Sequence, residues 1–318
     1  MRHGMFDRVH DARVRAAAFD WLGQQVALHG DVLPRKVLAE GFSLEGVRVP
    51  LVGPQGIFKP KILREVPLSI TTSPEGPYDD AFGPDDLLQY RYRGRDPNHP
   101  DNQGLRLAME RRLPLIYLHG VVPGRYLAAW PVFVAGDNPT NLAFSIAVDD
   151  ATHFRLEPDR FQGASVVRED ADSARRAYIT AAVRVRLHQR AFRERVLEAY
   201  RRQCAFCRLR HEELLDAAHI VPDSQPEGEP LVRNGLSLCT LHHAAFDRCF
   251  LGLRPDYVIE VRPDIRRERD GPTLVHAIQA LHGTRIVLPV PRGLRPDPAL
   301  VEIRYEQFRQ SSPRSLRP

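Results

Sequence analysis

The sequence predicts a mixed α+β protein with two domains: an N-terminal domain built on a curled β-sheet with flanking helices, and a small, turn-rich C-terminal domain. The chain has 318 residues, enough for two domains, because single domains usually have roughly 100–200 residues. Short strand-like runs broken by Pro and Gly fill the region from about residue 46 to 148. All four cysteines lie further along, between residues 204 and 249.

The N-terminal domain begins with a predicted helix at residues 11–30. Val14, Ala18, Trp21 and Leu22 recur at helical spacing and share one face, and Gly30 is a typical helix stop. This apolar face predicts that the helix packs on the sheet that follows.

Alternating runs after this helix predict the strands of the sheet. The earlier runs are at 47–52, 56–63, 67–72 and 87–94, with a polar loop at 73–86 and a short helix at 102–113. The most strand-like runs are at 113–122, 125–136 and 142–148. Their order predicts a curled antiparallel sheet that ends near Asp150.

The remaining chain divides by composition and spacing. We expect the N-terminal domain to span 1–160, a linker helix 161–188, a second domain 189–265, and a C-terminal extension 266–318 that packs on the second domain and ends in a disordered tail. Helical spacing also continues from 189 to 203, with Phe192, Val196, Leu197 and Tyr200 on one face.

Composition limits the class of protein. No stretch approaches the ~20 apolar residues that cross a bilayer, and the charged start of the chain has no signal-peptide core, so we expect a cytoplasmic protein without a membrane partner. The net charge of +5 comes mostly from arginine. Arginine suits phosphate and guanine edges, although a GC-rich genome would favour it as well.

Two short pairs in the C-terminal region have metal-ligand spacing. Cys204 and Cys207 form a C-x-x-C pair, and Cys239 and His242 form a C-x-x-H pair. Three thiolates and one imidazole are a standard set for structural Zn²⁺. Clustered cysteines in a cytosolic-looking chain favour metal over a disulfide scaffold, and a bound zinc would contribute directly to folding this segment.

Three further residues lie between and beside these pairs. His219 sits in a short apolar run, Asn234 follows fifteen residues later, and His243 follows nine residues after that. This order and spacing, nested within the cysteine pairs, resembles the HNH (ββα-metal) endonucleases, especially the zinc-containing branch found in modification-dependent restriction enzymes.

The resemblance implies a role for each position. His219 would be the general base that activates water, and Asn234 would brace the loop and orient His219 through a hydrogen bond. His243 would bind a catalytic Mg²⁺ or Mn²⁺ in a one-metal mechanism, with Asp247 as a second ligand. Histidine near neutral pH can accept the proton of water, and a hard cation stabilises phosphate charge.

One position departs from the family pattern. The residue before the base is often a metal-binding Asp or His, and here it is Ala218. Asp216 lies two residues earlier and shares the same side of a strand, so it could supply the missing carboxylate.

Two simpler interpretations remain open. The Cys/His set could form a zinc ribbon without catalysis, although His219, Asn234 and His243 together favour the nuclease. Asp247 could also serve only as a salt-bridge partner on a helix surface.

The predicted strands of the N-terminal domain combine arginine residues, which can bind phosphates, with aromatic residues, which can stack on bases. Its place ahead of an HNH module resembles the SRA-like (PUA-superfamily) readers of modified cytosine, which flip the base into a pocket. The candidate DNA contacts are Arg91, Tyr92, Arg93, Arg95, His119, Arg125 and Tyr126, together with Tyr78, Asp79, Tyr90 and Trp130.

Together, these two resemblances imply a modification-dependent restriction endonuclease. Its substrate would be double-stranded DNA carrying 5-methylcytosine or 5-hydroxymethylcytosine, cut by a homodimer because one active site cuts one strand. The alternatives are a sequence-specific or nicking HNH nuclease without modified-base recognition, and a non-catalytic zinc-containing DNA-binding protein.

Overall fold

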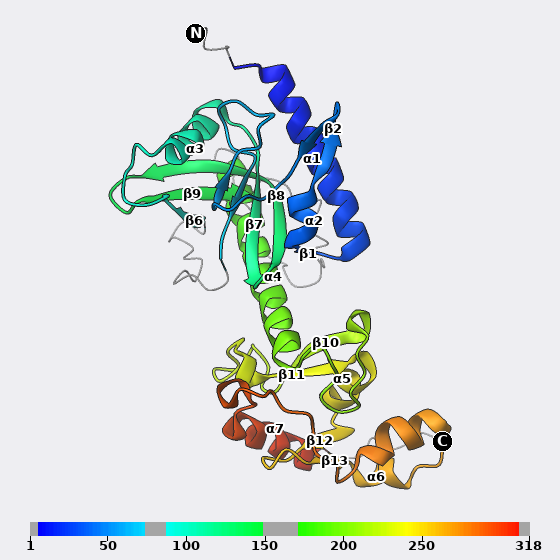
Figure 1. Cartoon of the computed structure of the whole chain (residues 1–318). Helices are drawn as coiled ribbons and strands as arrows, with labels where there is room; N and C mark the ends of the chain where they lie inside the picture. The colour runs from blue at the N-terminus through cyan, green and yellow to red at the C-terminus, as the bar shows by residue number, and fades with distance from the viewer. Residues whose placement is uncertain (1–5, 74–86, 149–170, 312–318) are drawn as a thin grey trace. The chain divides into compact units, whose positions relative to one another are not determined.

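The computed structural model describes residues 6–73, 87–148 and 171–311 (Figure 1). The chain divides into two compact units, Met1–Arg190 and Ala191–Pro318. The predicted polar loop, except its first residue, and the first ten residues of the predicted linker helix lie outside the described residues. No helix in the described ranges has the length and apolar character that a membrane span requires.

Unit 1 begins with α1 (Arg8–His29), as the sequence predicts. Asp7 accepts two backbone N–H groups of the first turn, and Gly30 ends the helix at φ 77°, a conformation that favours glycine. Val14, Ala18 and Leu22 are fully buried against the sheet. The 3.6-residue spacing thus identified the buried face correctly.

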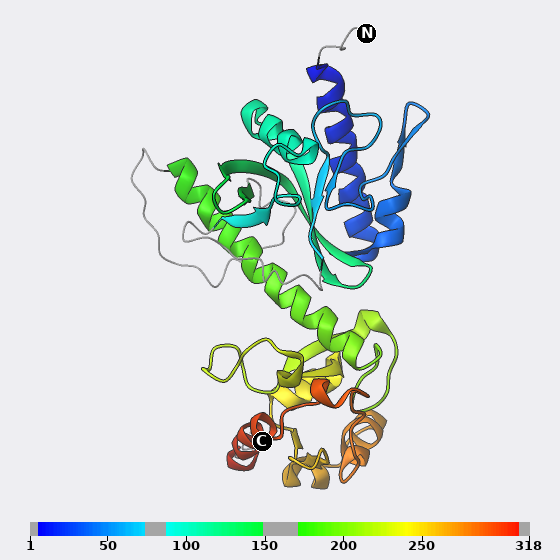
Figure 2. The same ribbon diagram turned by 60° about the vertical axis from the view of Figure 1, so that its left-hand side comes forward.

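The described residues of unit 1 form a seven-stranded sheet that curls into a half-barrel (Figures 1 and 2). Its strands are β1 (Val32–Pro34), β4 (Ile57–Phe58), β5 (Ser69–Thr71), β6 (Leu88–Arg91), β7 (Leu115–Val122), β8 (Arg125–Asn138) and β9 (Ala143–Val148). The main path is β4-β5-β7-β8-β9-β6, and β1 pairs with β8. Register shifts in β7–β8 and β8–β9 interrupt the ladders, and such bulges bend a sheet.

The sheet is mixed rather than antiparallel throughout, which corrects the prediction. β5 pairs with β7 in parallel, while the other pairs are antiparallel. Parallel neighbours need a long crossover, and here the connection contains β6 and α3 (Pro100–Arg111). Local spacing identifies strands but does not fix which neighbour each strand chooses.

Short elements in the first half of unit 1 also differ from the prediction. α2 (Arg35–Glu40) and the hairpin β2 (Phe42–Leu44)–β3 (Val47–Val49) follow β1. The strand-like run at 56–63 forms only β4, because Pro60 lacks the N–H that a strand pairing needs. Elements this short leave little periodic signal in the sequence.

The long helix α4 (Ala171–Ala199) joins the predicted linker helix and the helical run after it. It belongs to unit 1 up to Arg190 and to unit 2 from Ala191 onward. In unit 2 it buries the face that the sequence identified, with Phe192, Val196, Leu197 and Tyr200 all at most 3% exposed.

Unit 2 has a ββα arrangement at its centre. The antiparallel strands β10 (Leu215–His219) and β11 (Gly235–Cys239) are followed at once by α5 (Thr240–Asp247), which packs on them. The later elements are β12 (Leu251–Leu253), β13 (Ile259–Val261), α6 (Pro263–Arg267) and α7 (Pro298–Gln310).

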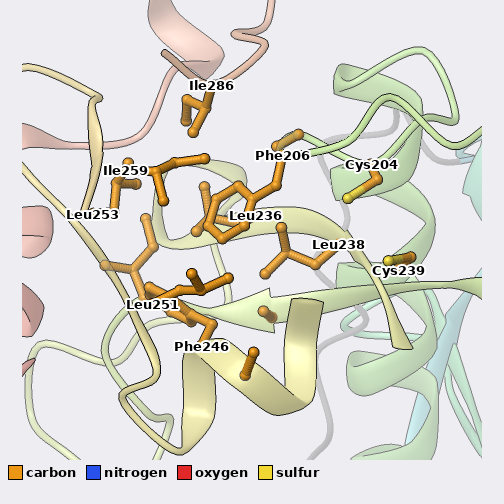
Figure 3. Close-up of a cluster of buried hydrophobic side chains, with 14 of the residues drawn as sticks. Cys204, Phe206, Leu236, Leu238, Cys239, Phe246, Leu251, Leu253, Ile259 and Ile286 are labelled. Carbon is orange, nitrogen blue, oxygen red and sulfur yellow. The ribbon is translucent and has the colours of Figure 1, made fainter. Parts of the chain in front are cut away.

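One hydrophobic cluster fills unit 2, with Cys204 and Cys239 at its edge (Figure 3). Ile278, Ile286 and Val301 of the C-terminal extension are buried in it. This extension contains a π-helical segment at Thr273–Ile278, a 3-10 turn at Gln279–Leu281 and an isolated bridge between Val258 and Arg285.

Candidate active site and metal centre

The β10–β11 hairpin places two of the three predicted catalytic residues at its ends. His219 ends β10 and pairs with Gly235, the first residue of β11, and Asn234 comes just before it. The loop from residue 220 to 234 therefore begins and ends beside the candidate base. The close approach of Gly228 to Pro222 shapes this loop, because a Cβ on Gly228 would lie 1.9 Å from the Pro222 carbonyl oxygen.

The buried amide of Asn234 holds this loop together. Its Oδ1 accepts the Val221 N–H at 2.9 Å, and its Nδ2 donates to the carbonyls of Val221 (2.8 Å) and Glu229 (3.1 Å). The side chain thus braces the loop, but it makes no hydrogen bond to His219, contrary to the expected orienting contact. The three hydrogen bonds of the Asn234 amide all go to main-chain groups of the loop.

His219 is held by packing. Its ring stacks on Phe192 of α4, with ring centroids 4.1 Å apart and planes inclined by 15°. Its Nε2 atom is buried and has no hydrogen-bond partner among the described residues. Burial lowers the pKa of His219 and outweighs the opposing charge of Asp223, so the neutral ring is favoured.

His243 lies on α5 between two carboxylates. Its Nδ1 is 3.1 Å from Asp216 Oδ2, and its Nε2 is 3.4 Å from Asp247 Oδ2. The hydrogen bond to Asp216 is the main reason that the pKa of His243 is raised. The two predicted carboxylates therefore both reach this histidine.

Asp216 is placed by its strand and by α4. Burial opposes its ionisation, but the hydrogen bonds from His243 and the Ala217 N–H and the charge of Arg193 together lower the pKa of Asp216. Ala218 is fully buried on the same face of β10. The Asp216 carboxylate, two residues before Ala218, remains half exposed beside His243.

His243, Asp216 and Asp247 do not surround a common point in this structure. The two nitrogens of one imidazole ring point in different directions, so one ion can replace the contact to Asp216 or the contact to Asp247 but not both. Both carboxylates are at least 50% exposed and can turn toward an ion from their present positions.

The four predicted zinc ligands do surround a common point. The ligand atoms of Cys204, Cys207, Cys239 and His242 all lie within 4.8 Å of one another, the one such group of three or more found in the described part of the chain. His242 Nδ1 is 3.2 Å from Cys239 Sγ and 3.5 Å from Cys204 Sγ. These spacings fit a tetrahedral ion with Zn–S bonds of about 2.3 Å.

The far side of the His242 ring is fixed by the C-terminal extension. Its Nε2 lies 2.7 Å from the Ala277 carbonyl oxygen, which can only accept a hydrogen bond, so Nδ1 is left to face the thiols. Hydrogen bonds from Cys204 and Cys207 hold the pKa of Cys239 well below its usual range. Three clustered sulfur atoms beside an imidazole oriented in this way fit a structural metal ion.

The structure separates the candidate DNA contacts of unit 1 into two groups. Tyr92 and Tyr126 are buried and bonded within the fold, Tyr92 to Asp137 and Tyr126 to Arg35, so their rings have core roles. Arg93 pairs with Asp101. Arg91 and Arg95 are exposed, and His119 and Arg125 are partly exposed. Tyr90 and Trp130 are buried, and Tyr78 and Asp79 lie outside the described residues.

Some residues of the site escaped sequence reasoning. The sequence placed Phe192 on the apolar face of a helix, but spacing alone does not reveal that its ring stacks on His219. Arg193 links α4 to the hairpin through the Leu215 carbonyl at 2.8 Å. Ala277 acts through its backbone, which leaves no signal in the sequence.

Comparison with known proteins agrees with this geometry. Residues 204–254 match the family model described as HNH endonuclease. No curated protein matches the sequence at a significant level. A solved structure described as a modification-dependent TagI restriction endonuclease aligns at 14% identity over 76% of this chain and 82% of that chain, with a TM-score of 0.27, too low to support an argument about function.

The matched segment contains the Cys/His cluster, His219, Asn234, His243 and Asp247, and the whole ββα arrangement. Unit 2 therefore contains an HNH endonuclease domain, and the chain is an enzyme of the phosphodiester-cleaving hydrolase class.

Proposed function

We propose that this protein is a modification-dependent DNA endonuclease whose unit 2 cleaves phosphodiester bonds and whose unit 1 selects modified DNA. The observation that carries the nuclease part is the arrangement of His219 at the end of β10 with His243, Asp216 and Asp247 beside the same hairpin. A base and a set of metal ligands on one ββα element are the groups that phosphodiester hydrolysis needs.

Each residue has a role in the proposed reaction. His219, neutral because burial lowers its pKa, accepts a proton from the attacking water through a ring nitrogen. His243, with Asp216 and Asp247, would hold one Mg²⁺ or Mn²⁺, which would supply positive charge beside the phosphate and the leaving oxygen. Asn234 keeps the loop beside His219 in place.

We propose that the Cys204–Cys207–Cys239–His242 cluster holds Zn²⁺ in a structural role. Three thiolates and an imidazole are soft and borderline ligands, which favour zinc over magnesium. Four protein ligands leave no open position for substrate, so this ion would stabilise the fold and take no part in the cleavage.

The proposal for unit 1 is that it recognises 5-methylcytosine or 5-hydroxymethylcytosine. Support comes from the curled sheet and from exposed Arg91 and Arg95 at and after the end of β6, which suit phosphate contacts. We further propose a homodimer, because two active sites are needed to cut both strands in one binding event.

The test is cleavage of one plasmid prepared unmodified, with 5-methylcytosine, and with 5-hydroxymethylcytosine, in Mg²⁺ or Mn²⁺. Wild type is compared with His219→Ala and with a control, His211→Ala, which removes an exposed histidine of the same unit. We expect cutting of modified DNA only, lost in His219→Ala and kept in His211→Ala.

The other outcomes distinguish the alternatives. Equal cutting of all plasmids would keep the nuclease and remove the modified-base reader. Accumulation of nicked circles without linear product would argue against the dimer. No cutting by wild type, with metal bound and DNA retained, would favour a non-catalytic DNA-binding protein.

A further inference from the structure

The orientation of the candidate base is not explained by hydrogen bonding. The Asn234 amide is directed at Val221 and Glu229, and His219 Nε2 has no partner among the residues the structure describes. A histidine that must present one ring nitrogen to a water needs a fixed ring plane. Another group has to supply that constraint.

Phe192 of α4 is the group in contact with the ring. The two rings are nearly parallel, inclined by 15° with centroids 4.1 Å apart, and Phe192 is 3% exposed. A stacked aromatic face restricts tilting of the imidazole without using either ring nitrogen.

The hairpin is built to let α4 come this close. Gly235 pairs directly with His219. A Cβ on Gly235 would lie 2.5 Å from Val196 Cγ2 and 3.0 Å from Phe192 Cζ. Its carbonyl also accepts a hydrogen bond from the Tyr200 hydroxyl at 3.3 Å. Three residues of α4 thus contact one glycine whose missing side chain makes room for the Phe192 ring.

We infer that Phe192 is a positioning residue for His219: the helix that enters the nuclease unit sets the plane of the catalytic base through an aromatic stack. This inference rests on the proposed function for its catalytic meaning. The matched family segment begins at Cys204, so the residue that orients the base lies outside it.

The experiment compares Phe192→Leu with Leu197→Ala. Leucine keeps an apolar side chain at position 192 but removes the flat face. Leu197 is fully buried in the same helix and the same hydrophobic cluster, so its truncation controls for general loss of packing. Thermal unfolding and metal content of both variants are measured first, to establish that each remains folded.

Two readouts follow. The first is plasmid cleavage: Phe192→Leu should lower kcat about 10- to 100-fold with little change in KM, because small misplacements of a catalytic group have effects of that size, while Leu197→Ala should stay within about twofold of wild type. The second is the NMR signal of the His219 ring, assigned by its loss in His219→Gln. It should move in Phe192→Leu as the ring current is lost, and stay in place in Leu197→Ala.

The two readouts separate this inference from the proposed function. If wild type cleaves no DNA but the His219 signal still moves in Phe192→Leu alone, the nuclease proposal fails and the stacking contact stands. If Phe192→Leu cleaves like Leu197→Ala, or if the His219 signal is the same in both variants, Phe192 is an ordinary core residue and the inference is wrong.

Discussion

His242 and His243 are neighbours on α5 and lie in two different side-chain clusters. His242 is 1% exposed, with Nδ1 directed at thiols and Nε2 at the Ala277 carbonyl. The side chain of His243 is 25% exposed, and each of its nitrogens contacts a half-exposed carboxylate. One short helix therefore presents a closed ligand set on one side and an open one on the other.

The difference shows how burial assigns roles to identical side chains. Ligands that are buried and fixed on both sides hold an ion permanently, which suits a structural role. Side chains that remain in contact with water, such as His243 and its two carboxylate partners, can give up their ion pairs and bind a metal ion and a substrate phosphate instead. The following predictions test this division, in order of decreasing effect.

Removal of the buried site should unfold unit 2. In Cys239→Ser we expect loss of bound metal and of the cooperative unfolding transition of unit 2, since structural zinc contributes on the order of 10 kcal/mol in small domains. Metal analysis and circular dichroism check this. Cys249→Ser is the matched control, because Cys249 lies outside the cluster; equal loss in both variants would contradict the assignment.

Removal of the open site should leave the fold intact. We expect His243→Ala to retain the structural metal and its thermal transition but to lose about 10²–10⁴-fold in cleavage rate, since a catalytic metal contributes several kcal/mol. Cleavage assays across a Mg²⁺ or Mn²⁺ titration measure it. Asp216→Asn and Asp247→Asn then show which carboxylate binds the metal together with His243. The variant that has lost a ligand should need a higher metal concentration for half-maximal cleavage.

The loop between β10 and β11 depends on one amide. Asn234→Ala leaves the buried Val221 N–H and two carbonyls without their partner, so we expect a loss of about 1–3 kcal/mol in the free energy of unfolding. Chemical denaturation measures this. Asn234→Asp should also destabilise, because a carboxylate cannot donate to the Val221 and Glu229 carbonyls; a neutral effect would show that the loop is held elsewhere.

The pH dependence of cleavage should follow the neutral form of His219. Burial lowers its pKa below the ordinary 6.5, with Asp223, Asp216 and Asp247 opposing and His243 adding to the shift. The base works unprotonated, so at saturating metal the rate should fall about tenfold per pH unit below that pKa and stay level above it. If the pH–rate profile has its midpoint above 6.5, or if His219→Ala shows the same fall in rate at low pH, the titrating group is not His219.

The smallest effect is expected at the far end of α5. Arg304 donates to the Phe246 carbonyl at 2.7 Å and lies over the Phe246 ring at 4.7 Å from its centroid. Arg304→Lys loses the planar stack but keeps the charge, so we expect a loss of about 0.5–1 kcal/mol in stability and little change in cleavage. Denaturation curves measured beside Arg309→Lys, an exposed arginine of α7, provide the comparison.

Several features of the fold and site were predictable because they depend on local spacing. The buried face of α1, the long strands β7 to β9 and the four Cys/His ligands all follow from residue type and periodicity. The C-x-x-C and C-x-x-H spacings bring the two members of each pair together locally, and the zinc-ligand chemistry of the four residues predicts that the two pairs meet.

Features that depend on contacts between distant segments were not predictable. The parallel pairing of β5 with β7, the Phe192–His219 stack and the Ala277–His242 contact each join residues far apart in the chain. Asn234 braces the loop as expected, but the additional hydrogen bond expected to His219 is not formed, because its amide bonds Val221 and Glu229 instead. Spacing in the sequence predicts the local element and the face on which a residue lies, whereas tertiary packing determines which distant residue it contacts.

The contact between the Ala277 carbonyl and His242 affects how short a fragment of unit 2 can fold with its metal site intact. A fragment cut after Arg254 would retain every ligand atom of the buried site, yet it would release the imidazole to rotate and to exchange tautomers. It would also expose the apolar surface that Ile278, Ile286 and Val301 cover. The smallest piece expected to fold with its metal in place therefore runs from Ala191 to Gln310, more than twice the length of the segment that the family shares.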